Sequence, residues 1–167
     1  AQDAAAKQSV EASIFEWLEM VVLSACLTLL IFTFGVRPAR VDGNSMQDTL
    51  HNGEMLIISD IAYKPKRGDI LVFQKINSTH PDPIVKRVIA TGGQSVDIDF
   101  TTGSVYVDGK LQIEPYIYEP TMLAGGLEFP LTVPEGCVFV MGDNRNNSHD
   151  SRAADIGCVS TDRILGK

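Results

Sequence analysis

The chain has 167 residues, 44% of them hydrophobic, and a formal net charge of −7. This composition is typical of a globular protein and argues against disorder. The acidic charge balance argues against nucleic-acid binding, which requires a basic surface. The length favours one domain with a short additional segment.

The N-terminal fifth of the chain predicts a membrane span. Residues 1–15 are mostly small and polar and are expected to form a short tail, and residues 16–36 are predicted to be a transmembrane helix. No residue from Met20 to Val36 is charged, a run of about 17 residues at the lower limit for crossing a bilayer. Trp17 and Arg37 flank this run as interfacial anchors do. A buried core helix is disfavoured, because the chain is too small to surround a helix that is apolar on every side.

Two other interpretations of this segment are weaker. Leu23–Cys26 has the form of a lipid-attachment site, but the apolar run continues well beyond Cys26. A cleavable secretory signal would begin with basic residues, whereas this segment has Glu16 and Glu19 there. The positive charges follow the span at Arg37 and Arg40, which by charge alone would place the rest of the chain in the cytoplasm.

Beyond Arg40 the sequence predicts strands. Short runs rich in β-branched residues are bounded by Gly, Pro and Asp, and Asp108-Gly109 is a hairpin signal. We predict an all-β domain over residues 37–167, with packed antiparallel sheets or a partly closed barrel. The expected strands are Met55–Ile58, Ile70–Phe73, Val85–Ile89, Ser104–Val107, Lys110–Ile113, Glu128–Val133 and Cys137–Met141.

Metal and nucleotide chemistry find no support in the sequence. The three histidines, His51, His80 and His149, are scattered, and no phosphate-binding glycine loop is present. Cys137 and Cys158 are compatible with a disulfide in an extracytoplasmic domain or with two separate buried thiols.

Ser45 is the candidate nucleophile, and a serine hydroxyl needs a base to take its proton. His149 with Asp150 could complete a triad, but Lys86 is the sharper candidate. On a strand its alternating neighbours are Ile84 and Val88. A lysine on that apolar face would lose solvation, which lowers its pKa and lets it act as a base.

Four motifs in one order, preceded by a membrane span, closely resemble bacterial type I signal peptidase, in the short single-span form typical of Gram-positive bacteria. These are Gly43-Asn44-Ser45-Met46 with Thr49-Leu50, Arg67-Gly68-Asp69-Ile70, Val85-Lys86-Arg87-Val88-Ile89 and the block from Gly142 to Arg152. The block from Gly142 to Arg152 is the most specific of them.

The resemblance implies a role for each matching residue. Ser45 would be the nucleophile and Lys86 the general base of a Ser-Lys dyad, with Ser148 orienting the lysine amine. The oxyanion hole would be the backbone of Ser45 and Gly43. The residues expected to support the site are Asp143, Arg145, Asp150 and Arg152, and those expected to line the substrate pocket are Val41, Asp42, Met46 and Val85.

The resemblance also implies the function: a membrane-anchored serine endopeptidase that removes signal peptides after Ala-X-Ala sites, without cofactor or metal. Its partners would be signal peptides of secreted preproteins, the lipid bilayer and, transiently, the translocation machinery. The catalytic domain would face outward from a bacterial cell membrane, against the weak charge bias. Asp48 stands where the family usually has proline.

Two rival functions remain. A self-cleaving repressor-type peptidase would use the same dyad, but the apolar run and the acidic charge count against it. A non-catalytic, membrane-tethered β-module would keep the fold and lose the dyad. With lysine as the base, we expect the acidic limb of kcat/KM roughly between pH 7.5 and 9.

Overall fold

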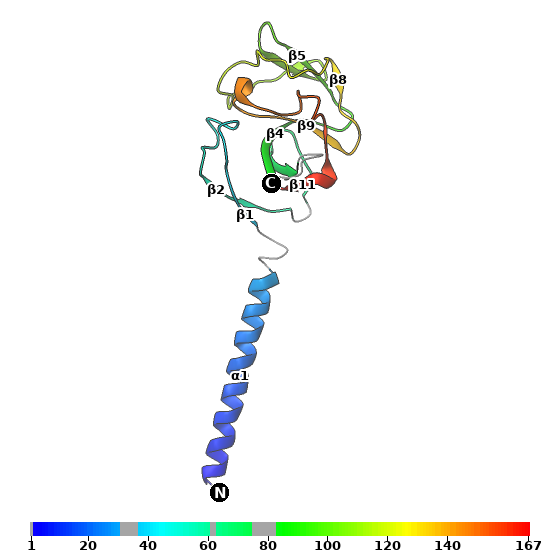
Figure 1. The fold of residues 1–167 in the computed structure, drawn as a ribbon. Coiled ribbons are helices and arrows are strands. Elements are labelled where there is room, and N and C mark those ends of the chain that lie inside the picture. The colour runs from blue at the N-terminus through cyan, green and yellow to red at the C-terminus, as the bar shows by residue number, and fades with distance from the viewer. Residues whose placement is uncertain (1, 31–36, 61–62, 75–82) are drawn as a thin grey trace. The chain divides into compact units, whose positions relative to one another are not determined.

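The structure is a computed structural model that describes residues 2–30, 37–60, 63–74 and 83–167, with side chains from residue 13 onward. It divides into two compact units, Ala1–Arg37 and Pro38–Lys167. Figure 1 shows a single helix in the first unit and strands in the second.

The first unit contains helix α1 (Gln2–Leu30). Neither proline nor glycine interrupts this sequence, and its first turns are rich in alanine, the strongest helix former. The helix begins earlier than residue 16, so it includes most of the residues expected to form a tail. Within it, Ser13–Leu30 is long and apolar enough to cross a membrane, and none of that stretch is buried. Residues 31–36 of the expected span lie outside the described residues.

The second unit is built from three sheets. A five-stranded sheet has the order β10-β9-β4-β3-β11, and a four-stranded sheet has the order β7-β6-β5-β8. The pairings within both are antiparallel, as the sequence predicted. The five-stranded sheet comprises β3 (Ile70–Gln74), β4 (Pro83–Thr91), β9 (Cys137–Met141), β10 (Val159–Ser160) and β11 (Ile164–Gly166).

The four-stranded sheet comprises β5 (Ser95–Asp99), β6 (Ser104–Val107), β7 (Lys110–Leu111) and β8 (Leu131–Thr132), and a separate pair joins β1 (Arg37–Arg40) to β2 (Met55–Ile58). In Figure 1 the sheet that carries β5 and β8 lies at the opposite end of this unit from β1 and β2. The described part of the unit has only two short 3-10 helices, Arg145–Asn147 and Thr161–Arg163, which agrees with the prediction of an all-β domain.

Apolar side chains on both faces of β9 explain why this strand is a continuous hydrophobic run. Phe139 and Met141 pack into the core that the four-stranded sheet shares, while Val138 and Val140 pack into a second core with Leu71. Successive strand residues point to opposite faces, so a strand buried on both sides has no polar alternation. Strand β9 therefore lies between the two hydrophobic cores.

The hairpin at Asp108-Gly109 confirms its sequence signal. Both residues have positive φ, 52° and 70°, as a two-residue type I′ turn requires, and Val107 pairs with Lys110. The strand expected at Glu128–Val133 shortens to Leu131–Thr132, because Pro130 has no N–H to donate to a ladder. The return strand expected to reach Ile113 ends at Leu111.

Candidate active site

Strand β4 places Lys86 in the interior, where only 3% of the residue is exposed. Its strand neighbours Ile84 and Val88 pack in the second core, as the alternation predicted. The amine Nζ donates hydrogen bonds to Ser45 Oγ at 2.7 Å and to the Val85 carbonyl at 2.9 Å. The distance between Ser45 and Lys86 is within the range expected for a nucleophile and its base.

Burial lowers the pKa of Lys86 to about 8. The carboxylates of Asp150 and Asp143 oppose this shift because they favour the charged amine, and the guanidinium of Arg152 assists it. A lysine with this pKa is partly neutral near pH 8, so it can accept the proton of a serine hydroxyl.

Ser45 lies in the loop between β1 and β2, and the loop that follows β9 holds it there. The Asn144 N–H donates to the Ser45 carbonyl at 3.0 Å, and the Asn144 side chain donates to the Asn44 carbonyl at 3.1 Å. Ser45 thus joins two segments that are almost 100 residues apart in the chain.

The two expected oxyanion donors differ. The Ser45 N–H has no acceptor among the described residues, so it is free to bind a developing oxyanion. The Gly43 N–H instead donates to Asn52 Oδ1 at 3.0 Å, with φ of 92° at Gly43. A contribution from Gly43 would require this bond to break, and it stays a prediction.

Ser148 is close to this centre but makes no hydrogen bond to the lysine in the described structure. Its hydroxyl is buried without a partner in hydrogen-bond geometry, although it lies near enough to Asp150 to help lower the pKa of that carboxyl. A Cβ added at Gly142 would lie 2.2 Å from the Ser148 hydroxyl and 2.4 Å from the Ser45 carbonyl oxygen, so only glycine fits between them. The orienting role of Ser148 stays a prediction.

Asp150 and Arg152 form a buried ion pair whose charges act on Lys86. Arg152 donates to both carboxylate oxygens, at 2.8 and 2.9 Å, and the Gly142 N–H donates to Asp150 at 2.9 Å. Burial alone would raise the pKa of the Asp150 carboxyl, but Arg152 holds it below its ordinary value. Arg152 also donates to the Leu123 carbonyl, which connects the loop after β9 to a segment 29 residues earlier in the chain.

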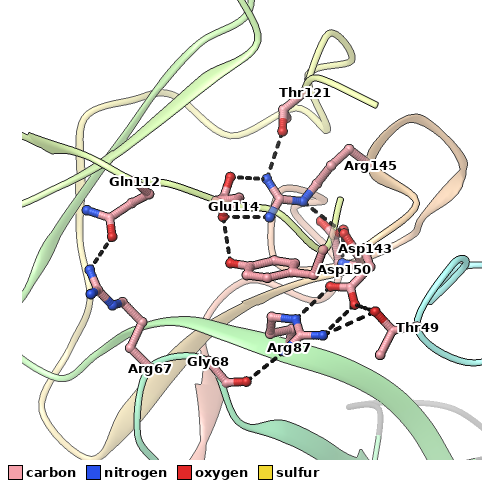
Figure 2. Close-up of polar contacts among 12 residues, drawn as sticks. Thr49, Arg67, Gly68, Arg87, Gln112, Glu114, Thr121, Asp143, Arg145 and Asp150 are labelled. Carbon is pink, nitrogen blue, oxygen red and sulfur yellow. Dashed lines mark hydrogen bonds and ion pairs between the residues drawn. The ribbon is translucent and has the colours of Figure 1, made fainter. Parts of the chain in front are cut away.

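Asp143 and Arg145 pair with residues outside the set expected to support the site. Asp143 accepts two hydrogen bonds from Arg87, at 2.8 and 2.6 Å, and one from Thr49 at 2.5 Å. Arg145 donates to Glu114 at 2.8 and 2.7 Å. Figure 2 shows Arg87, Asp143 and Thr49 grouped together, with Arg145 and Glu114 beside them.

Of these two partners, Arg87 lies within a sequence motif and Glu114 does not. Arg87 follows Lys86 directly on β4, so its side chain points to the opposite face of the strand, where it pairs with Asp143. Glu114 lies about 30 residues before Arg145, outside any motif, so no sequence pattern pointed to it.

The expected pocket residues divide by exposure. Val41 and Met46 are buried, and Asp42 is exposed. Val85 lines a largely apolar cavity of about 310 Å³ together with Leu56, Ile70 and other residues of β2 and β3. Their roles toward a substrate stay predictions.

The histidine alternative finds no support here. His149 Nε2 lies 2.9 Å from Asp155, and the Asp150 carboxylate is occupied by Arg152 and Gly142. The described residues contain no cluster of side chains that could hold a metal ion. Cys137 and Cys158 are both free thiols.

A serine hydroxyl that is hydrogen-bonded to a buried lysine is a recognised variant of the catalytic triad of serine hydrolases. The sequence matches the family described as signal peptidase, peptidase S26, over residues 14–167. It is 38% identical to a signal peptidase I of Bacillus licheniformis over 92% of this chain and 86% of that protein. It is 39% identical to signal peptidase I T of Bacillus subtilis, strain 168, over 90% of this chain and 81% of that protein.

A solved structure agrees. The crystal structure of a signal peptidase I from Enterococcus faecalis V583 matches with a TM-score of 0.51 and 30% identity, over 62% of this chain and 96% of that one. The chain therefore belongs to the signal peptidase family, peptidase S26, and is a serine endopeptidase.

Proposed function

We propose that this protein is a membrane-anchored signal peptidase I that cleaves with a Ser45-Lys86 dyad. The observation that carries the proposal is the 2.7 Å hydrogen bond between Lys86 Nζ and Ser45 Oγ in a buried site. The dyad needs a lysine that can lose its proton near neutral pH, and burial supplies this by lowering the pKa of Lys86 to about 8.

The reaction has two halves. Neutral Lys86 takes the proton of Ser45 Oγ as this oxygen bonds to the scissile carbonyl carbon, and the Ser45 N–H stabilises the oxyanion. The tetrahedral intermediate breaks its C–N bond, and Lys86 gives the proton to the leaving amine. A water molecule then attacks the Ser45 ester, loses its proton to Lys86, and the proton returns to Ser45 Oγ.

The substrates would be preproteins with small side chains at the first and third positions before the cut. The cavity of about 310 Å³ that Val85 lines has mostly apolar walls, which favour an uncharged substrate side chain. The four charged residues near the dyad are all paired: Asp150 with Arg152, Asp143 with Arg87, and Arg145 with Glu114. Because each of these four groups has a described ion-pair partner, none of them is left to bind a charged substrate residue.

The location would be a bacterial cell membrane, with one span and the catalytic unit outside. The apolar stretch Ser13–Leu30 supports an anchor in the lipid bilayer. An anchored enzyme meets substrates that the bilayer also holds, at a high effective concentration. Transient contact with the translocation machinery would follow, since preproteins emerge there.

Cleavage of an Ala-X-Ala peptide by the wild-type protein, Ser45→Ala and Lys86→Ala tests the dyad. We expect both variants to lose almost all activity while staying folded, with Lys110→Ala as a control because Lys110 is an exposed lysine. Lys86→Arg should be nearly as inactive, since a guanidinium stays protonated. An inactive wild-type protein would instead favour a non-catalytic module, and an active Lys86→Arg would give the base to another residue.

The orientation has its own test. Asp162 is exposed, so a cysteine placed there in a chain without Cys26, Cys137 and Cys158 can be labelled. A membrane-impermeant maleimide should react with Asp162→Cys in intact spheroplasts. Labelling only after lysis would place the catalytic unit in the cytoplasm.

A further inference from the structure

The segment after β7 reaches the residues that support the dyad. Glu114 pairs with Arg145, the Tyr116 ring lies 4.0 Å from the Arg87 guanidinium, and the Tyr118 N–H donates to the Asp143 carbonyl at 3.0 Å. Three residues of one short segment therefore contact three charged residues of the catalytic loop and of β4.

Arg87 is the centre of these contacts. It follows Lys86 on β4, and its guanidinium donates to Asp143 at 2.8 and 2.6 Å and to the Gly68 carbonyl at 2.8 Å. Asp143 in turn accepts from Thr49, four residues after Ser45. The Arg87–Asp143 pair thus connects the strand of the base to the loop of the nucleophile, as Figure 2 shows for Arg87, Asp143 and Thr49.

Tyr116 has two contacts that define its position. The ring lies against Arg87, a cation–π geometry worth about 0.5–2 kcal/mol depending on its exposure to water. The hydroxyl donates to Glu114 at 2.9 Å. Tyr116 also lines an open cavity of about 690 Å³, and Arg87 is not among the residues that line it.

We propose that Tyr116 is a positioning residue for the reaction: it holds Arg87 on Asp143 and so sets Lys86 against Ser45. The proposal rests on the Ser45-Lys86 dyad. Tyr116 itself does not touch the dyad, and it lies outside every motif that the sequence analysis identified.

The consequence for pH can be derived from the charges around Lys86. The amine faces Asp150 and Asp143, which stabilise its charged form, and Arg152, which destabilises it. If Arg87 leaves Asp143, the negative charge of that carboxylate is no longer neutralised. The lysine then binds its proton more tightly, and the acidic limb of kcat/KM moves to higher pH.

The experiment compares Tyr116→Leu, Tyr116→Phe and Tyr118→Leu with the wild-type protein. Tyr116→Leu should lower kcat about ten- to a hundredfold with little change in KM, as a small misplacement of reacting groups does. Its acidic limb should rise by roughly half a pH unit. Tyr116→Phe keeps the aromatic ring, so the acidic limb of its kcat/KM profile should stay at the wild-type pH. Tyr118→Leu is the matched control, because its side chain is exposed and only its backbone contacts Asp143.

A second variant keeps the size of the side chain, so its result does not depend on whether Tyr116→Leu folds. Pentafluorophenylalanine at position 116 keeps the ring shape and reverses its charge distribution, so its limb should also rise relative to Tyr116→Phe. An unchanged limb and kcat in this variant would overturn the proposal, whether or not Tyr116→Leu folds. A rise in KM alone would show that Tyr116 contacts substrate instead.

The experiments distinguish an error in the proposed dyad from an error in the proposed role of Tyr116. If the dyad is wrong, Ser45→Ala retains activity measured in parallel. If only the positioning role is wrong, Ser45→Ala is inactive and the ring variants behave as wild type.

Discussion

In the proposed dyad, the pKa of Lys86 sets the pH range in which the site can work. A histidine base would have an ordinary pKa near 6.5, whereas lysine begins near 10.4 and must be brought down by its surroundings. Here burial supplies the decrease, and it places the pKa of Lys86 at about 8. The amine is then mostly protonated at pH 7 and mostly neutral above pH 9.

We therefore predict that kcat/KM on an Ala-X-Ala peptide still rises between pH 7 and 9, with an acidic limb near pH 8. Below this pKa the protonated amine cannot accept the serine proton, so activity falls as the pH falls. A profile from pH 5 to 10 measures the limb. Replacing His51, His80 and His149 together should leave it unchanged, and a limb near 6.5 that disappears with His149 would make histidine the base.

At the scale of elements, the loop after β9 acts as a charged support for β4. It carries Asp143 and Asp150, and each carboxylate is paired with an arginine inside the protein. Removing one partner of a buried pair leaves an uncompensated charge, at a cost of about 3–5 kcal/mol. The same charges also act on Lys86, so stability and catalysis respond to the same residues.

Asp150→Asn and Arg152→Met should both destabilise the protein but should move the acidic limb in opposite directions. Losing the Asp150 charge lowers the pKa of Lys86, and losing the Arg152 charge raises it, by roughly half to one pH unit each. Denaturant unfolding and pH profiles measure the two effects. Shifts of the same sign would mean that the loop acts on Lys86 through its shape rather than its charges.

At the scale of the whole molecule, both hydrophobic cores among the described residues are formed by side chains of the unit Pro38–Lys167. The apolar stretch Ser13–Leu30 is exposed throughout, so its hydrophobic surface needs another apolar environment. A bilayer supplies one, and the family to which the chain belongs works on preproteins that carry signal peptides.

A chain that begins at Pro38 should keep kcat/KM on a soluble peptide within a few-fold of the full chain. It should process membrane-held precursors much more slowly, because the anchor no longer raises the effective concentration, an effect on the order of 10²-fold or more. Replacing Ser13–Leu30 with an apolar span of the same length is the control and should restore processing. Equal processing without any anchor would remove this role from the helix.

Local patterns in the sequence were enough for several parts of this structure. The apolar run indicated the long helix, because a span needs only composition and length. The strands Met55–Ile58, Ser104–Val107 and Cys137–Met141 were predicted with their observed bounds, and the Asp108-Gly109 turn with its conformation. Each of these strands and the turn is determined by residues that are close together in the chain. The same holds for the apolar alternation around Lys86.

Tertiary structure alone decided which distant groups meet. The short strands β1, β10 and β11 carry little pattern of their own and exist through their pairing with β2, β9 and β3. The ion pair of Glu114 with Arg145 and the contact of Tyr116 with Arg87 join residues about 30 positions apart. Such contacts follow from how the sheets pack, and no spacing along the chain encodes them. The sequence was therefore enough to predict Ser45 and Lys86 as a pair, whereas only the fold shows which distant groups surround them.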